Sequence, residues 1–483
     1  MEINFKRFFR DELSIDDIQV AMDNGEITSK ELVMFYLSRI AKYDQSGKQI
    51  NSMLEINPDA LFIAEALDNE RILKGARGPL HGIPVVLKDN IETKDSMHTS
   101  AGTIALENHL ASKDAFLVKQ LREAGAILLG KANMTELANG MSSTMWAGYS
   151  ARGGQTLNPY GDPTLFVGGS SSGSAVAVAS NFTVLSVGTL TDGSILSPAI
   201  QNSVVGIKPT VGLISRDGVI PFTYSQDTPG PFARNVKDAA VLLGVLKGKD
   251  EYKGENSKPQ DYTGYLDPNG LKGAKIGLFN KGSKDYYECG EYDEQLFNNA
   301  IQILTEQGAT IIKNIDIPSF HREWKWDVSL YELKHSLDNY LHQLPAHMPV
   351  HSISELIQFN QTIGEKALKY GQDKLESRKF FPNTLRNAEY LNAKLEDLYF
   401  SQEQGIDFSL KKYGLDAIVF PSYIGSTLCA KAGYPSIAVP AGYMESGRPF
   451  GITFASSAFS EGVLIKFAYA FEQASLLRKA PKF

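Results

Sequence analysis

The sequence predicts an α/β fold, with a large mixed β-sheet as its core and helices covering both faces. Helical and strand patterns alternate along the chain, several strand segments are apolar throughout, and no repeat of about 20–50 residues is visible. An apolar strand needs cover on both sides, so these patterns favour a sheet between two helical layers. We expect one domain over 1–483, with a motif-rich core at about 75–235 and 413–475.

The first elements follow from capping and periodicity. TSKELVMFYLSRIAKYD predicts a helix, because Thr28 and Glu31 form a capping box before an apolar face. HGIPVVLKDNI predicts a short buried strand that leads into a polar loop. DAFLVKQLREAGAILLGK predicts a helix that stops at Gly125, followed by a strand over Ala126–Leu129.

Strand and helix patterns are also found toward the C-terminus. IVFPS, SIAVPAG and FGITFAS predict strands, and SEGVLIKFAYAFEQAS predicts a helix capped by Ser460. Between the two parts, about 246–400 departs from the alternation. Leu246–Lys275 is polar and rich in Gly and Pro, which indicates a surface excursion. About 320–400 is helical by pattern, and we expect this helical excursion to lie over the site, although ordinary packing helices explain its aromatic residues equally well.

Composition narrows the class of function. The 48 Lys+Arg and 55 Asp+Glu residues give a net charge of −7, and no basic run or RNA-binding aromatic motif occurs, which disfavours a nucleic-acid partner. MEINFKRFFRDELSIDD has no apolar signal region, and no apolar run reaches the roughly 18 residues that span a bilayer. Cys289 and Cys429 lie far apart without metal-ligand spacing. We therefore expect a cytoplasmic protein with structural thiols, no membrane partner, no metal and no cofactor.

The stretch VGGSSSGSAVAVAS, which begins at Val167, has three interpretations. A flexible linker is disfavoured because the serines run directly into an apolar segment. A hydrolase elbow matches G-x-S-x-G with Ser171 as the nucleophile, but no buried strand precedes it. The elbow also needs a histidine near the C-terminal strands. All histidines after residue 320 instead lie in the helical excursion: His321, His335, His342, His347 and His351.

The third interpretation joins this stretch to VGTLTDGSILSPA. There, Thr191, Asp192, Gly193 and Ser194 predict a tight turn after a buried strand, and consecutive backbone N–H groups in such a turn suit an oxyanion hole. A serine nucleophile needs a base, and Lys88 in PVVLKDN is the candidate. Taken alone, Lys88 is more typical of a surface lysine, and Ser194 is more typical of an ordinary serine in a turn. Sequence spacing therefore does not decide whether these two residues are catalytic.

Together these segments resemble the amidase signature family, and within it the peptide amidase type of bacterial amidase. The resemblance covers most of the chain, and its most specific part is the glycine-serine segment with a second G-S 24 residues later. It is weaker over about 246–400, where YELK and ISELIQFN still match the peptide amidase type. The segments that carry it are GPLHGIPVVLKDNI, MHTSAGTIAL, LREAGAILLGKANMTELA, GGSSSGSAVAVA, TDGSI, VVGIKPTVGLISRDGVIPFTYSQDTPGPFAR and GYPSIAVPAGY with GRPFGITF.

The resemblance implies a Ser–Ser–Lys catalytic unit. Ser194 matches the nucleophile, Ser170 the bridging serine after a cis bond from Gly169, and Lys88 the base, and the amides of Thr191–Ser194 match the oxyanion hole. A lysine base working near pH 8 needs a pKa about two to three units below its usual value of about 10.4, and burial lowers it in that direction.

Two positions depart from the family pattern. Many members have an acidic residue where this chain has Leu190, and Arg where it has Leu196. Our hypothesis is that apolar packing has replaced a polar support beside the nucleophile. The implied function is a stand-alone amidase that releases ammonia from C-terminal peptide amides or small amides through an acyl-enzyme on Ser194. Two alternatives stay open: the A-type subunit of a tRNA-dependent amidotransferase, which TDGS and YELK disfavour, and a catalytically silent binding protein.

Overall fold

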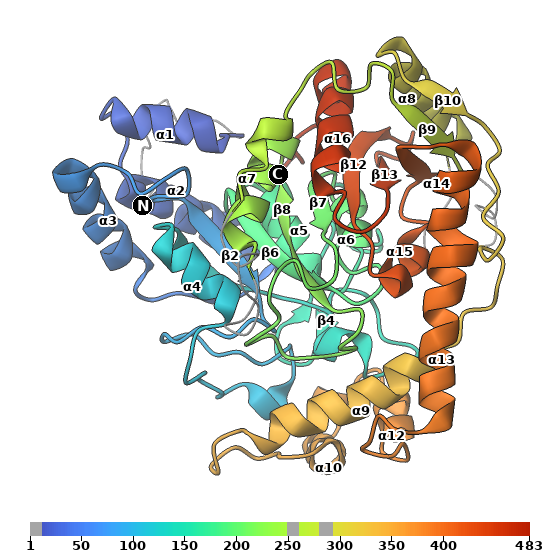
Figure 1. The fold of residues 1–483 in the computed structure, drawn as a ribbon. Coiled ribbons are helices and arrows are strands. Elements are labelled where there is room, and N and C mark those ends of the chain that lie inside the picture. Colours follow the sequence, from blue (N-terminus) through green and yellow to red (C-terminus); the bar gives the residue numbers. More distant parts are fainter. Residues whose placement is uncertain (1–11, 249–259, 280–292) are drawn as a thin grey trace.

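The computed structural model describes residues 12–248, 260–279 and 293–483 (Figure 1). Eleven strands form one sheet in the order β1-β3-β2-β6-β8-β7-β12-β13-β11-β9-β10, and β4 and β5 form a separate hairpin. The strands are β1 Met53–Ile56, β2 Pro84–Lys88, β3 Ile127–Ala132, β4 Tyr149–Ser150, β5 Gly154–Gln155, β6 Leu185–Leu190, β7 Val205–Lys208, β8 Thr228–Ala233, β9 Lys275–Leu278, β10 Thr310–Ile312, β11 Ala417–Pro421, β12 Ser436–Tyr443 and β13 Pro449–Ala455.

The sheet is mixed. Strand β2 runs parallel to β3 and β6, and β9 runs parallel to β10 and β11. The central pairs β6–β8, β8–β7, β7–β12 and β12–β13 are antiparallel. The predicted large mixed sheet is therefore confirmed.

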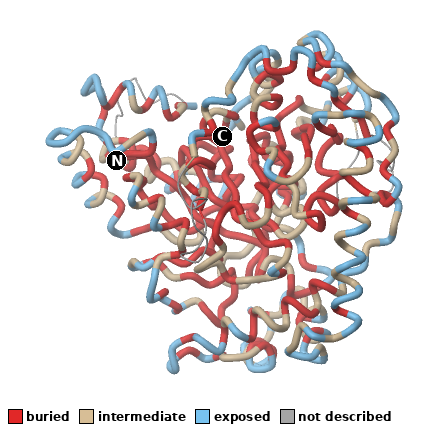
Figure 2. The backbone as a smooth tube through the Cα atoms, in the orientation of Figure 1, coloured by how far each residue is buried: buried red, intermediate tan, exposed pale blue. Residues whose placement is uncertain are grey.

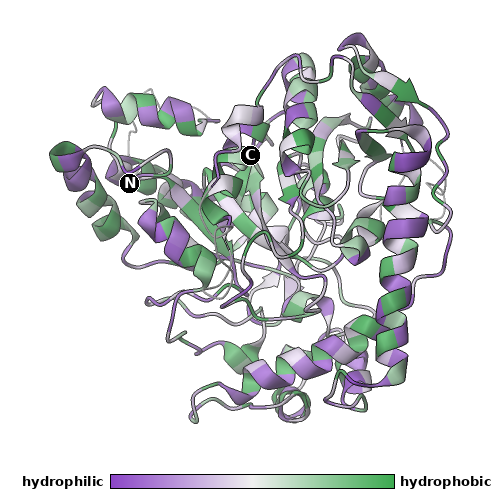
Figure 3. Cartoon of the chain, in the orientation of Figure 1, coloured by the Kyte–Doolittle hydropathy of each residue, from purple (hydrophilic) through white to green (hydrophobic). Residues whose placement is uncertain are grey.

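Helices cover both faces of this sheet. In β11, Ala417 and Val419 pack into one apolar cluster with α7 (Val236–Leu246) and α16 (Glu461–Ser475). The alternate residues Ile418 and Phe420 pack into a second cluster with α6 (Leu196–Gln201) and α15 (Ser426–Ala432). Since successive side chains of a strand point to opposite faces, both faces are buried. Figure 2 shows this buried centre, and Figure 3 shows apolar strands there with polar residues concentrated on the outer helices.

Several local predictions hold. Helix α2 (Ser29–Arg39) begins after Thr28, and the capping box with Glu31 is present. Helix α4 (Phe116–Glu123) ends just before Gly125, whose φ of +77° is one that glycine adopts without strain. The strand that follows, β3, begins one residue later than expected and continues to Ala132.

The predicted capping role of Ser460 is wrong. Helix α16 does begin after Ser460, but the side chain makes no hydrogen bond to the first turn. Ser460 has φ −93° and ψ 16°, a near-helical conformation, and its Oγ lies 3.3 Å from Oγ of Ser457. A capping serine has extended backbone that turns its hydroxyl toward the N–H groups ahead of it.

The expected helical excursion is present. Figure 1 shows α9 crossing one end of the molecule and α13 running along its side. The helices of this region are α9 Asp327–His342, α10 Ile353–Ile363, α11 Glu365–Leu368, α12 Asp373–Arg378 and α13 Ala388–Leu398. The remaining α-helices of the described residues are α1 Ile15–Asp23, α3 Ala60–Lys74, α5 Ser172–Ala179, α8 Glu294–Glu306 and α14 Asp407–Tyr413.

Two sequence predictions concern residues only partly described. Cys289 and part of the polar segment Leu246–Lys275 lie outside the described residues. Cys429 is buried and free, and burial raises the pKa of its thiol to about 12, which agrees with a structural thiol. Within the described ranges, no helix has the length and apolar character needed to cross a bilayer.

Candidate active site

Strand β2 ends at Lys88, whose side chain is completely buried. Its Nζ lies 2.7 Å from Oγ of Ser170, 2.9 Å from Oγ1 of Thr189 and 3.2 Å from the carbonyl oxygen of Thr189. The amine is thus held between the ends of β2 and β6 and the glycine-serine segment. The surface-lysine interpretation of Lys88 is excluded.

Burial also changes the acidity of this lysine. Removal from water penalises the ammonium form and lowers the pKa of Lys88 to about 7, while the nearby charge of Asp227 opposes that shift. A large fraction of the amine is therefore neutral at neutral pH. A neutral amine beside a serine hydroxyl can accept its proton.

The glycine-serine segment is tightly packed and buried. The peptide bond between Gly169 and Ser170 is cis, as the family resemblance implied. A Cβ on Gly168 would lie 2.6 Å from Cα of Pro198, and a Cβ on Gly173 would lie 2.4 Å from the carbonyl oxygen of Asn133. Both glycines are needed for close backbone approach, which a flexible linker does not have.

Ser171 occupies a structural position. It is fully buried, its Oγ donates to the carbonyl oxygen of Thr189 at 2.9 Å, and the N–H of Thr189 donates back at 3.2 Å. No strand precedes it, and α5 begins at Ser172. A hydrolase elbow presents its nucleophile on an exposed turn after a strand, so the elbow interpretation fails.

The turn Thr191–Ser194 follows β6 directly and is half-buried. The carbonyl oxygen of Ser194 accepts from the N–H of Ser171 at 3.3 Å, which fixes this turn against the glycine-serine segment. Among the described residues, none accepts a hydrogen bond from the N–H groups of Gly193 and Ser194. A Cβ on Gly193 would lie 3.4 Å from Oγ of Ser426, so the first residue of α15 packs against this turn.

The two departures from the family pattern are buried in apolar surroundings. Leu190 is 1% exposed and Leu196 is fully buried, and both belong to the second apolar cluster. This burial agrees with our hypothesis of apolar packing at both positions.

Sequence reasoning missed the residues that hold the two ends of the site. Nδ2 of Asn90 donates to Oγ1 of Thr189 at 3.0 Å, so the hydroxyl beside Lys88 is itself fixed. Oγ1 of Thr191 donates to Asp227 at 2.5 Å, and Nε2 of Gln226 donates to the carbonyl oxygen of Thr191 at 3.0 Å. The sequence did hold a signal for these residues, because Asn90 lies in VVLKDNI and Gln226 and Asp227 lie in YSQDTPG. Both are segments that carry the family resemblance.

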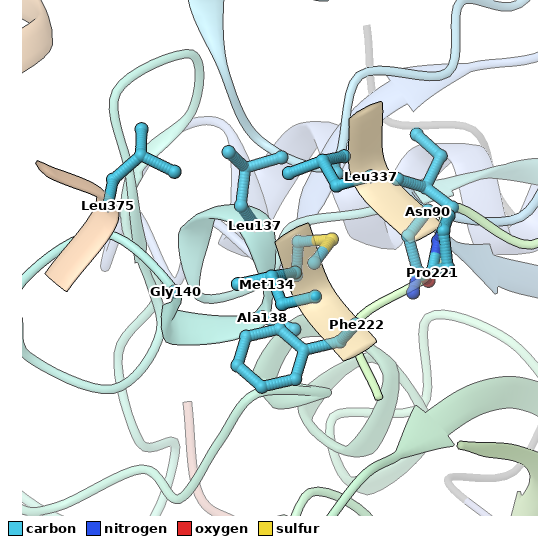
Figure 4. A pocket seen from close by; sticks show the side chains of 12 residues that line it. Asn90, Met134, Leu137, Ala138, Gly140, Pro221, Phe222, Leu337 and Leu375 are labelled. Carbon is cyan, nitrogen blue, oxygen red and sulfur yellow. The ribbon is translucent and has the colours of Figure 1, made fainter. Parts of the chain in front are cut away.

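A pocket lies beside this site (Figure 4). It is lined by the loop after β3, by residues 220–222 and by two helices of the excursion, α9 and α12. A second pocket shares Asn90, Ala138, Ile220 and Phe222 with it and reaches Thr189 and Thr191. The first pocket is lined by Asn90, Ala101, Met134, Leu137, Ala138, Gly140, Ile220, Pro221, Phe222, Leu333, Leu337 and Leu375.

The loop that forms one wall has unusual backbone. Leu137, Ala138 and Asn139 have φ values of 38°, 53° and 68°. Left-handed backbone is uncommon for such residues and is kept where the surroundings hold it, often at functional sites. The N–H of Leu137 donates to the carbonyl oxygen of Ala101 at 2.7 Å, which fixes the loop against the neighbouring chain segment. Across the described ranges, no group of three His, Cys, Asp or Glu side chains is arranged to hold a metal ion.

The fold and the family comparison define the class of protein. A family model described as Amidase matches residues 31–465, so the chain belongs to the amidase family. Hydrolysis of amide bonds, predicted from the sequence, is confirmed as its activity class.

Individual relatives agree with this class. The chain is 40% identical to a probable amidase of Arabidopsis thaliana over 98% of this chain and 92% of the relative. The crystal structure of native peptide amidase from Stenotrophomonas maltophilia superposes with a TM-score of 0.91, at 40% identity and 99% coverage of both chains. An amidase family protein from Bacillus anthracis superposes with a TM-score of 0.90, at 41% identity over 98% of this chain and 92% of that chain.

Proposed function

We propose that this protein is a stand-alone amidase that releases ammonia from carboxamides through an acyl-enzyme on Ser194. Lys88 is the base, Ser170 relays the proton, and the amides of Thr191–Ser194 form the oxyanion hole. The observation that carries the proposal is the 2.7 Å contact between Nζ of the buried Lys88 and Oγ of Ser170.

The reaction follows from this arrangement. Neutral Lys88 takes the proton of Ser170, which takes the proton of Ser194, and Oγ of Ser194 attacks the carbonyl carbon of the amide. Backbone N–H groups of the turn stabilise the oxyanion. The proton then returns through Ser170 to the nitrogen, the C–N bond breaks, and ammonia leaves. Water attacks the acyl-enzyme by the same proton route and releases the carboxylic acid.

The proposed substrates are C-terminal peptide amides or other small amides. Two observations support this choice: likeness to a solved peptide amidase at 40% identity, and a neighbouring pocket lined mainly by apolar side chains. An apolar pocket favours an acyl group with a hydrophobic side chain, since burial of apolar surface stabilises its binding.

The amidotransferase alternative has weaker support. The A-type subunit of the glutamyl-tRNA(Gln) amidotransferase of Prochlorococcus marinus is 32% identical over 97% of this chain and 98% of that protein.

The alternative of a catalytically silent binding protein conflicts with the lowered pKa of Lys88 and its contact with Ser170. The cytoplasmic location stays a prediction from the sequence.

Ammonia release by the purified chain tests the proposal. The wild-type protein and Ser194→Ala are compared on small amides and on C-terminally amidated peptides. Release by the wild type alone, in the absence of any partner, supports a Ser194-dependent stand-alone amidase. Release that needs added partner subunits of a tRNA-dependent amidotransferase supports that alternative, and equal release by both forms contradicts the role of Ser194.

A further inference from the structure

A buried carboxylate of the helical excursion contacts the chain segment beside the proposed oxyanion hole. Glu332 on α9 is 1% exposed. One carboxylate oxygen accepts from the N–H of Ser225 at 2.7 Å, and the other accepts from the hydroxyl of Tyr390 on α13 at 2.8 Å. Nζ of Lys394 lies 3.6 Å from that second oxygen. A buried carboxylate needs hydrogen-bond partners, and here one of the partners is the backbone N–H of Ser225 in a neighbouring loop.

That loop is the turn 222–227, which α9 contacts at a second point. Oγ1 of Thr223 and Oγ of Ser329 lie 2.7 Å apart, and both side chains are buried. Ser329 and Glu332 are three residues apart, so they share one face of α9. The turn is closed internally by Asp227, whose Oδ2 accepts from the N–H groups of Phe222 and Thr223 at 2.8 and 2.9 Å.

The other side of the same turn holds Thr191. Oγ1 of Thr191 donates to Oδ1 of Asp227 at 2.5 Å, and Gln226 donates to the Thr191 carbonyl oxygen at 3.0 Å. Strand pairing explains the proximity, because Leu190 at the end of β6 pairs with Thr228 at the start of β8. Thr191 therefore has its side chain and its carbonyl group fixed by residues of the turn.

We propose that Glu332 is a positioning residue of the amidase reaction: it holds the turn 222–227 and, through Asp227 and Gln226, the orientation of Thr191–Ser194. The inference rests on the proposed function, since it gives Thr191–Ser194 the oxyanion role. Oxyanion donors act only within a narrow range of distances, and a displacement of about 1 Å can reduce a rate about 100-fold. Glu332 is the acidic residue of the YELK segment.

The competing explanation is that Glu332 only stabilises the helical excursion. Asp338 on the same helix is a matched control, because it is also buried. It accepts from the N–H of Ile353 at 2.8 Å and from Nζ of Lys334, and both of these partners lie within the excursion. Both Glu332→Ala and Asp338→Ala remove a buried carboxylate from α9, but only Glu332→Ala releases a contact to the turn.

The test measures kcat and KM for ammonia release by Glu332→Ala, Glu332→Gln and Asp338→Ala. We expect kcat of Glu332→Ala to fall about 10- to 100-fold with KM changed less than about twofold. Glu332→Gln keeps an acceptor oxygen for Ser225 and recovers most of the loss. Asp338→Ala lowers the unfolding temperature with kcat within about twofold of wild type. Equal losses of kcat in the two alanine variants, or a change in KM alone, would overturn the inference.

A second set of variants tests whether Glu332 acts on Thr191 through the turn 222–227. In a Thr191→Val/Gln226→Leu background both side-chain bonds between the turn and Thr191 are absent, so Glu332→Ala should then reduce kcat less than about threefold, because coupled residues are not additive. A full loss in that background contradicts the route. If Glu332→Ala does not fold, Glu332→Asp decides, since its shorter side chain withdraws the carboxylate from the N–H of Ser225. An unchanged kcat in Glu332→Asp would then overturn the inference. Retained activity in Ser194→Ala would instead contradict the proposed function itself.

Discussion

Nζ of Lys88 lies 2.7 Å from Oγ of Ser170, although 82 residues separate them in the chain. The two groups reach one another because β2 ends at Lys88 in the interior of the sheet, beside the end of β6. A hydrogen bond of this length permits direct proton transfer from the hydroxyl to the neutral amine. The relay proposed for Ser194 depends on this contact.

Lys88→Met should abolish most of the activity while the protein stays folded. Methionine fills a similar volume without a charge or a basic nitrogen, so the relay has no proton acceptor. We expect kcat/KM to fall about 10²- to 10⁴-fold, the usual contribution of acid–base catalysis. Ammonia release gives the rate, and thermal unfolding monitors the fold. A folded Lys88→Met with more than about half the wild-type kcat/KM would show that Lys88 is not the base.

The pH dependence should follow the amine of Lys88. In the proposed mechanism the neutral amine is the active form, and burial lowers the pKa of Lys88 to about 7. The neutral fraction therefore rises with pH, and kcat/KM should increase about tenfold per pH unit well below 7 and level off above about 8. Measurement of kcat/KM for ammonia release from about pH 5 to about pH 9 checks this dependence. A rate that falls as pH rises through 7 would require a protonated group instead.

Substitutions of Ser170 and Ser171 should affect different properties, catalysis in the first case and stability in the second. Ser170→Ala removes the relay hydroxyl, and we expect kcat to fall about 10²- to 10⁴-fold with little change in stability. Ser171→Ala leaves the buried backbone groups of Thr189 without their hydroxyl partner, which costs about 1–3 kcal/mol of unfolding free energy. Denaturant unfolding and ammonia release are measured for both variants. If Ser171→Ala, rather than Ser170→Ala, lost activity while remaining stable, the assignment of the relay would be reversed.

Leu190→Glu should destabilise the protein. The side chain is buried in an apolar cluster that includes Leu196, where many family members have Arg. A carboxylate without a partner there is expected to lower the free energy of unfolding by about 3–5 kcal/mol. Leu190→Met preserves the volume and should cost less than about 1.5 kcal/mol. Equal stability of the two variants would mean that a partner for the carboxylate already exists at this position.

Local sequence patterns were sufficient for much of the fold. The capping box of Thr28 with Glu31, the strand Pro84–Lys88 and the glycine stop at Gly125 depend on neighbours within a few residues, and all three are present. The division into a motif-rich core and an excursion remains a prediction. Spacing alone left Lys88 undecided between a surface group and a base, since its burial depends on distant segments.

The supporting contacts of the site could not be predicted from local pattern. Asp227 holds Thr191 across 36 residues, and Glu332 holds the N–H of Ser225 across 107. Such pairs arise from strand register and helix placement, which propensity and periodicity do not specify. The left-handed backbone of Leu137 and Ala138 was missed for the same reason, because tertiary contacts hold it.

Covalent labelling of Ser194 tests the central claim most directly. The protein is incubated with an activated ester of an amino acid, which acylates the nucleophile, quenched in acid, and digested for peptide mass spectrometry. The account predicts an acyl adduct on the peptide segment containing Ser194, absent in Ser194→Ala and strongly reduced in Lys88→Met. An adduct on Ser170 or Ser171 in an active wild-type enzyme, or an unchanged adduct yield in Lys88→Met, would contradict it.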